Sequence, residues 1–114
     1  MKLIMAKLKQ DGLDATFKAI TEKKFNDRDL YPFINKLDGT SVAHGANAAM
    51  VGKDMSGVQD QDGRFLVRAM AETAKSGGGW VDYKWPNPVT NMIDAKSSYV
   101  ERFDDYFVGV GVYR

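Results

Sequence analysis

The chain has no cysteine, and its 114 residues include one histidine and three prolines. Without cysteine there is no disulfide, no thiolate nucleophile and no zinc–thiolate site, and both reducing and oxidising compartments remain open. With a single histidine, a metal site would need carboxylates as all its other ligands, and no HExxH pair exists. We therefore expect no metal and no cofactor.

The chain also lacks an excess of charge of either sign. Lysine and arginine total 16, aspartate and glutamate total 15, and the formal net charge is +1. Such a balance offers no electrostatic footprint for nucleic acid or for an anionic membrane. No segment approaches the roughly 18 consecutive apolar residues of a membrane helix, and Lys7 and Lys9 interrupt the apolar N-terminus too early for a signal peptide. We expect no nucleic-acid partner, and neither a membrane segment nor a signal peptide in this chain.

What the chain does have is an ordinary globular composition, with 44% hydrophobic and 27% charged residues. Its length suits one domain, residues 1–114, which we divide into an N-terminal helical part (1–28) and a sheet core (29–114). In the helical part, apolar residues recur at helical spacing on both sides of Gly12. This pattern predicts the end of one helix before Gly12 and a second short helix after it.

The most clearly delimited strand lies within residues 77–88 (GGGWVDYKWPNP), between a run of glycines and two prolines. Its alternation puts Val81, Tyr83 and Trp85 on one face. Tyrosine and tryptophan combine an apolar body with a polar tip, which suits the wall of a ligand pocket. The alternative interpretation is that these side chains are packed core.

Upstream of this strand the pattern predicts a hairpin, a loop and a helix. Residues 30–37 and 41–46 form the hairpin around an Asp-Gly turn, with Pro32 favouring an edge or a bulge near the start. Residues 47–63 predict a loop with one helical turn. Residues 64–75 predict an amphipathic helix that covers one face of the sheet.

Downstream, residues 96–103 and 106–113 predict two more strands of an antiparallel meander. Gly109 and Gly111 share one face of the last strand, where the missing side chains leave room for a helix or a ligand. The elements together predict an α+β domain of PAS-like layout: a five-stranded antiparallel sheet with an N-terminal helix and a helical insertion covering one face.

Several motifs in fixed order resemble the single Cache domain family. The resemblance covers residues 29–114, and its motifs are LDGT (37–40), AHGAN (43–47), VGK (51–53), GWVDYKWPNPVT (79–90), KSSYVE (96–101) and VGVGVY (108–113). The resemblance implies a Cache fold and an extracytoplasmic, periplasmic sensor domain of bacteria that binds small molecules, often small carboxylates. Members occur in chemoreceptors and sensor kinases or stand alone, and they usually carry a signal peptide or membrane helix and a long N-terminal helix, of which this chain has only the tail.

Lys96 and His44 are the candidate polar groups of a ligand site. Lys96 follows the proline turn that ends the aromatic strand, so it can deliver an ammonium to a pocket lined by Tyr83 and Trp85, where a carboxylate would suit it. A solvated lysine at a strand end is the alternative. A lone strand histidine is often a hydrogen-bonded structural residue, and the family resemblance supports a ligand contact for His44.

Four further residues complete the predicted site. Tyr31 and Phe33 face the same way from the first strand and extend the wall, with core packing as the alternative. Tyr99 lies on the face opposite Lys96 in a regular strand and reaches the same ligand only through a bulge or at a strand end. Arg68 is a second candidate cation, although helical arginines are commonly exposed.

No catalytic constellation can be assembled, so we expect no enzyme activity. There is no nucleophile elbow, and the glycine run follows a helix and lacks the ending of a phosphate-binding loop. A calcium loop aligned on Gly63 would put Val58 and Ala69 where carboxylates are required.

The sequence thus predicts a small-molecule sensor domain that recognises a small organic carboxylate, with a homodimer through the N-terminal helix as a further expectation. The alternative is a ligand-free interaction or dimerisation module of the same fold.

Overall fold

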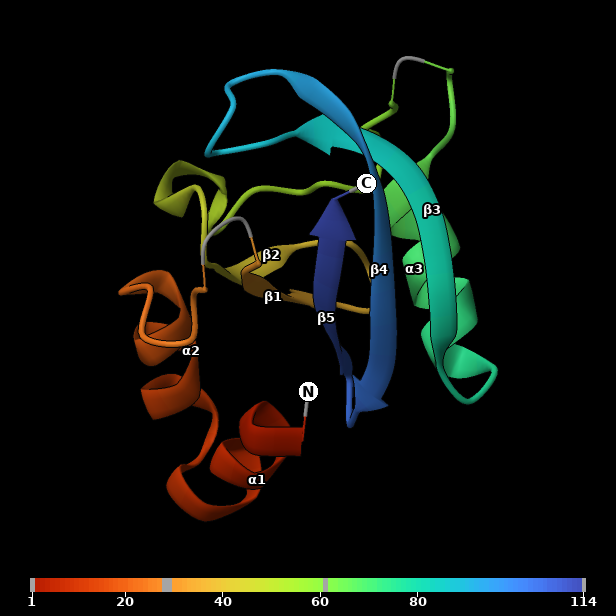
Figure 1. Cartoon of the computed structure of the whole chain (residues 1–114). Coiled ribbons are helices and arrows are strands. Elements are labelled where there is room, and N and C mark those ends of the chain that lie inside the picture. The colour runs from red at the N-terminus through yellow and green to blue at the C-terminus, as the bar shows by residue number, and fades with distance from the viewer. Residues whose placement is uncertain (1, 28–29, 61, 114) are drawn as a thin grey trace.

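The computed structural model describes residues 2–27, 30–60 and 62–113, and the boundary predicted between residues 28 and 29 lies outside them. The strands form one antiparallel sheet in the order β2-β1-β5-β4-β3 (Figure 1), which confirms the predicted α+β class. In chain order the elements are α1 (Lys2–Asp11), α2 (Leu13–Thr21), β1 (Pro32–Lys36), β2 (Ser41–His44), the 3-10 turn η1 (Ala48–Met50), α3 (Leu66–Lys75), β3 (Gly79–Pro86), β4 (Ile93–Phe103) and β5 (Tyr106–Tyr113).

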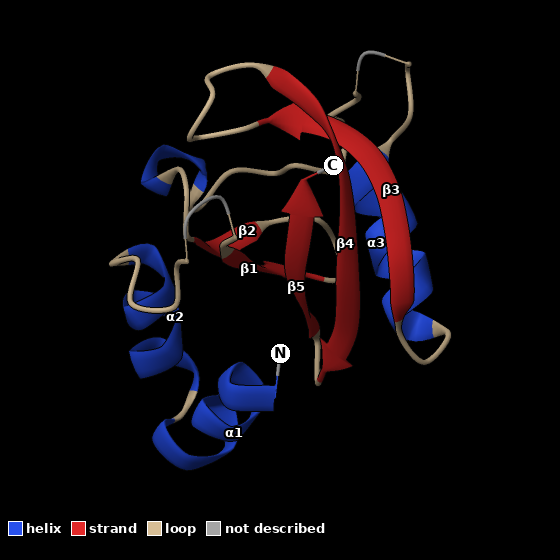
Figure 2. Cartoon of the chain, viewed as in Figure 1, coloured by secondary structure: helices blue, strands red, loops and turns tan. Residues whose placement is uncertain are grey.

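Helices lie on both faces of the sheet (Figure 2). On one face, Leu8 of α1 and Ile20 of α2 belong to the same buried apolar cluster as Ile34 of β1. On the other face, α3 packs over β3 and β4. Because successive strand residues point to opposite faces, the neighbours Phe107 and Val108 of β5 belong to different clusters, Phe107 on the α3 side.

Glycines end two of the helices, as the sequence predicted. Gly12 separates α1 from α2 with φ of 86°, and Gly77 follows α3 with φ of 108°. Only glycine adopts such left-handed backbone at little cost, so the chain turns sharply at both positions. None of the helices in the described part of the chain is long and apolar enough to span a bilayer.

The edge position predicted for the first strand is wrong. β1 lies between β2 and β5, and Pro32 is in register with Val110 of β5. Proline is tolerated because it is the first residue of the strand, and its carbonyl accepts a hydrogen bond from the Gly45 N–H at 3.0 Å. The irregularity of β1 comes later, as a register shift between Ile34 and Asn35 opposite β2.

The loop after β2 is tied back to the β1–β2 hairpin. The Gly52 N–H donates to the Ser41 carbonyl at 2.7 Å, and the Met55 N–H donates to the Gly39 carbonyl at 2.9 Å. These bonds hold the loop against the β1–β2 end of the sheet, while α3 packs over the β3–β4 end.

Candidate ligand-binding site

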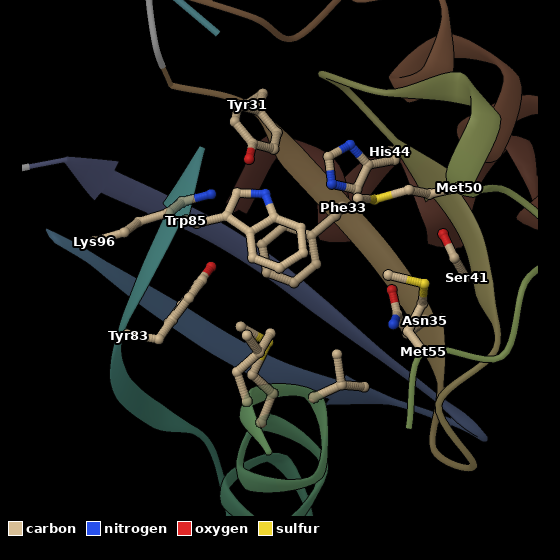
Figure 3. Close-up of a pocket in the computed structure, with 13 residues that line it drawn as sticks. Tyr31, Phe33, Asn35, Ser41, His44, Met50, Met55, Tyr83, Trp85 and Lys96 are labelled. Atoms are coloured by element: carbon tan, nitrogen blue, oxygen red, sulfur yellow. The ribbon is translucent and has the colours of Figure 1, made fainter. Parts of the chain in front are cut away.

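A pocket lies between the sheet, α3 and the loop after β2 (Figure 3). Its cavity volume is about 30 Å³, which is room for a few non-hydrogen atoms. The lining residues are Tyr31, Phe33, Asn35, Ser41, His44, Met50, Met55, Leu66, Val67, Met70, Tyr83, Trp85 and Lys96.

Lys96 carries the positive charge of this lining. β4 begins at Ile93, so Lys96 lies inside the strand and not at its opening, and its side chain is 2% exposed. The alternative of a solvated strand-end lysine is therefore wrong. Its Nζ lies over aromatic rings, an arrangement that favours a cation. The distances to the ring centroids are 4.0 Å for Tyr31, 5.0 Å for Tyr113, 5.5 Å for Phe33 and 5.7 Å for Tyr83.

Two glycines of β5 make room for this arrangement. A Cβ on Gly111 would lie 2.3 Å from Cε of Lys96, and a Cβ on Gly109 would lie 2.3 Å from Cζ of Phe33. The space left by these glycines is thus filled by the stem of Lys96 and the ring of Phe33. The predicted close approach of a helix or a ligand at this position is wrong.

Replacing Gly111 by alanine is expected to lower the free energy of unfolding by about 1–3 kcal/mol, because the new methyl group overpacks the stem of Lys96. It would also meet Ser98 Oγ at 2.4 Å. Gly57→Ala is the matched control: a Cβ there meets nothing within 4 Å, and the expected change is within about 0.5 kcal/mol. Urea unfolding of both variants measures the difference, and equal stabilities would contradict the packing argument.

His44 is both a structural residue and part of the pocket lining. Its Nδ1 accepts the backbone N–H groups of Ala46 at 3.1 Å and Asn47 at 2.9 Å, so the ring proton of the neutral form resides on Nε2. Nε2 lies on the side of the ring toward Lys96 (Figure 3). Burial and then the charge of Lys96 lower the pKa of His44 to about 4, so the imidazole is neutral at pH 7 and offers a hydrogen-bond donor.

Tyrosine hydroxyls supply the other polar atoms around Lys96. Tyr31 and Tyr113 share a hydrogen bond of 3.2 Å, Tyr113 donates to the Pro86 carbonyl at 2.7 Å, and Tyr83 shares a bond of 2.7 Å with Ser98 Oγ. Burial raises the pKa of both Tyr31 and Tyr83, so their hydroxyls stay protonated. The Tyr31 and Tyr83 hydroxyls near Lys96 are therefore neutral.

Most of the residues predicted for the site line this pocket: Tyr31, Phe33, His44, Tyr83, Trp85 and Lys96. Arg68 does not, because α3 buries Leu66, Val67 and Met70 and leaves Arg68 exposed, with its guanidinium 4.4 Å from the Phe65 ring centroid.

Tyr99 also lies outside the pocket. The β3–β4 register runs without a shift from Gly79–Val100 to Pro86–Ile93, so no bulge turns Tyr99 toward the side of Lys96. Its ring packs instead against Trp80, with the two centroids 5.6 Å apart.

Several lining residues were missed in the sequence. Asn35, Ser41, Met50 and Met55 stand in a hairpin and a loop without a sustained period, and nothing in their spacing marks them. Tyr113 contacts Lys96 and could have been found, because it shares the alternating face of Gly109 and Gly111.

The sheet order, the helices on both faces and the pocket beneath α3 define a PAS-like domain. A family model described as a Cache domain matches residues 4–114. The chain therefore belongs to the Cache domain family, which confirms the resemblance seen in the sequence.

Among curated proteins, the chain is similar to two sensors. It is 35% identical over 88 residues to the sensor histidine kinase MctS of Rhizobium johnstonii, covering 75% of this chain and 19% of MctS. It is 34% identical over 90 residues to the methyl-accepting chemotaxis protein McpP of Pseudomonas putida, covering 76% of this chain and 16% of McpP. The chain thus spans less than a fifth of the length of these relatives.

Solved structures show the same fold. A methyl-accepting chemotaxis protein from Vibrio parahaemolyticus superposes with a TM-score of 0.83 at 21% identity, covering 98% of this chain and 76% of that one. A periplasmic sensor domain of a chemotaxis protein gives 0.80 at 27% identity, covering 98% and 83%. A Cache chemosensory domain solved for carboxylic acid recognition gives 0.77 at 29% identity, covering 98% and 82%.

Proposed function

We propose that this chain is the sensing domain of a bacterial signal-transduction protein and that it binds a short organic carboxylate in the pocket around Lys96. The observation that carries the proposal is an ammonium that is almost fully buried, 2% exposed, in the wall of a small pocket. An anion that enters the pocket meets this ammonium in a site shielded from water, where charge-assisted hydrogen bonds are strong. The similar Cache domain that recognises carboxylic acids supports this choice of anion.

The neighbours of Lys96 favour a single carboxylate. His44 offers an Nε2–H, and the hydroxyls of Tyr31 and Tyr83 remain protonated, so each is a donor or acceptor that adds no second charge. The volume of about 30 Å³ favours ligands of a few non-hydrogen atoms.

His44 also suggests how occupancy is passed on. Its Nδ1 holds the start of the loop after β2, and its backbone N–H donates to Thr21 Oγ1 at the end of α2 at 3.5 Å. A ligand that closes residues 47–63 over the pocket would therefore shift the packing of the N-terminal helices. The signal is the difference in ligand affinity between the two arrangements.

The similar proteins also support a proposal for the cellular location and role of the domain. We propose that residues 1–114 act as one non-catalytic sensing unit in the periplasm, because a similar solved structure is a periplasmic sensor domain. We further propose that the chain forms a homodimer through its N-terminal helix. Its output is that of a sensor kinase or of a chemoreceptor, as in the similar proteins.

A calorimetric and thermal-shift comparison of acids with their amides tests the function. Acetate, propionate and butyrate are expected to raise the melting temperature by several degrees, since a ligand at a hundred times its dissociation constant adds about 2.7 kcal/mol. Acetamide, propionamide and butyramide have nearly the same shape without the charge and should give no shift.

Equal shifts in melting temperature for acids and amides would show that the charge of Lys96 does not contribute to ligand recognition. A melting temperature that rises with protein concentration and ignores every acid would favour the ligand-free dimerisation module instead.

A further inference from the structure

A second polar group lies at the end of the pocket remote from Lys96. Ser41 of β2 lines the pocket and is 1% exposed, and its Oγ has no hydrogen-bond partner among the described residues. Figure 3 shows its side chain beside Asn35, Met50 and Met55, across the pocket from Lys96. Buried hydroxyls in native proteins are almost always hydrogen-bonded, so this one points to an occupant that the chain itself does not supply.

Asn35 adds a second polar side chain at the same end. Its Nδ2 reaches the Gly39 carbonyl only at 3.4 Å, which is long for a hydrogen bond, and the residue is 5% exposed. The register shift between Ile34 and Asn35 lies opposite Ser41 and interrupts regular pairing here. This end of the pocket therefore offers a hydroxyl that can donate and accept hydrogen bonds. Next to it lies the Asn35 amide, whose N–H group makes only a long hydrogen bond.

The rest of this end is apolar and adaptable. Met50 and Met55 complete the wall there, and methionine side chains repack readily around irregular groups. Among the described lining residues, Lys96 is the one cation, and it lies at the opposite end of the pocket. A second carboxylate placed at Ser41 would be buried without a cation, which is unfavourable.

We propose that Ser41 and Asn35 form a second subsite that binds a neutral oxygen, a hydroxyl or a carbonyl, at the far end of a carboxylate ligand whose acid group lies at Lys96. The proposal rests on the proposed function and deepens it. The pocket then has two ends with different chemistry, and it selects monocarboxylates with a polar, uncharged tail over alkanoates and over dicarboxylates of the same length.

The test compares matched acids on the purified 114-residue chain by isothermal titration calorimetry. Alkanoates of three to six carbon atoms are paired with the ω-hydroxy acids in which a hydroxyl replaces the terminal methyl group, and dicarboxylates of equal length form a third set. At the length that spans the pocket, the hydroxy acid is expected to bind about fivefold tighter than its alkanoate, as one net hydrogen bond gives.

Ser41→Ala is expected to remove this preference, so that each hydroxy acid binds no tighter than its alkanoate. The half-exposed Ser56, which does not line the pocket, supplies the control Ser56→Ala, in which the preference should persist. The melting temperature of Ser41→Ala is expected to be unchanged or higher, because the substitution removes an unpaired buried hydroxyl.

The outcomes separate the two proposals. If no acid of any set binds, the proposed function fails and the subsite fails with it. If alkanoates bind but hydroxy acids have no advantage at any length, or keep their advantage in Ser41→Ala, the subsite is overturned while the carboxylate site stands. A loss of affinity in Ser41→Ala that is equal for all acids would also overturn it, since that result indicates a serine that holds a structural water.

Discussion

Lys96→Met is expected to weaken carboxylate binding about a hundredfold or more while leaving the fold intact. Methionine keeps an unbranched stem over Gly111 and removes the charge from the ring cluster. Truncating one partner of a buried charge pair costs roughly 2–5 kcal/mol of binding. The unliganded variant loses the contacts of the ammonium with the aromatic rings and also loses its desolvation cost at a site that is 2% exposed, so the two effects on the unfolding free energy oppose each other. Calorimetry with acetate and propionate, together with urea unfolding, measures both effects.

Lys84→Met is the matched control for this substitution. Lys84 lies on the neighbouring strand β3 in register with Ala95, but its side chain is largely exposed and pairs with Asp62 at 3.5 Å. Removing its charge should change neither acid affinity nor stability by more than about 0.5 kcal/mol. Full acid binding in Lys96→Met would refute the carboxylate site, and a large loss of stability there would show that the lysine is structural.

Lowering the pH from 6.5 to 4 is expected to reduce the unfolding free energy by about 3 kcal/mol through His44 alone. Burial lowers the pKa of this residue from 6.5 to about 4 in the folded protein. Well above pH 6.5 the ring is neutral in both states and the contribution is complete. Between the two values the unfolded chain takes up a proton that the folded chain excludes, so stability falls as the pH falls.

His44→Asn isolates this contribution, since the asparagine oxygen can accept the Ala46 and Asn47 N–H groups in place of Nδ1. Backbone N–H groups also lower the pKa of Asp38, Asp54 and Asp60, but these carboxyls titrate in both proteins and cancel in the difference. Urea unfolding of both proteins without ligand across this pH range gives the comparison. Parallel stability curves would show that the buried histidine is not held neutral.

Much of the fold could be predicted because its signals are local. Gly12 and the glycines after α3 end helices by their backbone conformation, and the alternation of Val81, Tyr83 and Trp85 assigns one face of β3. The edge prediction for β1 failed because strand order is not a local property. Pro32 restricts only the local backbone, and its partner in β5, Val110, lies more than seventy residues further along the chain.

The two misplaced site residues show the same limit. The alternation of β4 already put Tyr99 on the face opposite Lys96, and only a supposed bulge brought it to the ligand; the regular register of β3 with β4 removes that route. Arg68 was a candidate because of its charge alone, while the buried face of α3 was set by Leu66, Val67 and Met70. Charge marks a candidate, and the packing of its element decides where it points.

By itself, the sequence determined the α+β class, the antiparallel meander, the aromatic face of β3 and membership of the Cache family, because each depends on residue order, period and turn chemistry. Only the tertiary structure decided that Lys96 is buried over Gly111, that Tyr113 joins it, and that Ser41 faces the other end of the same pocket. The physical reason is that these residues come from β2, β4 and β5 and meet through the register of these strands and of β1, which lies between β2 and β5. That register is a property of the assembled sheet, and no single segment of the chain contains it.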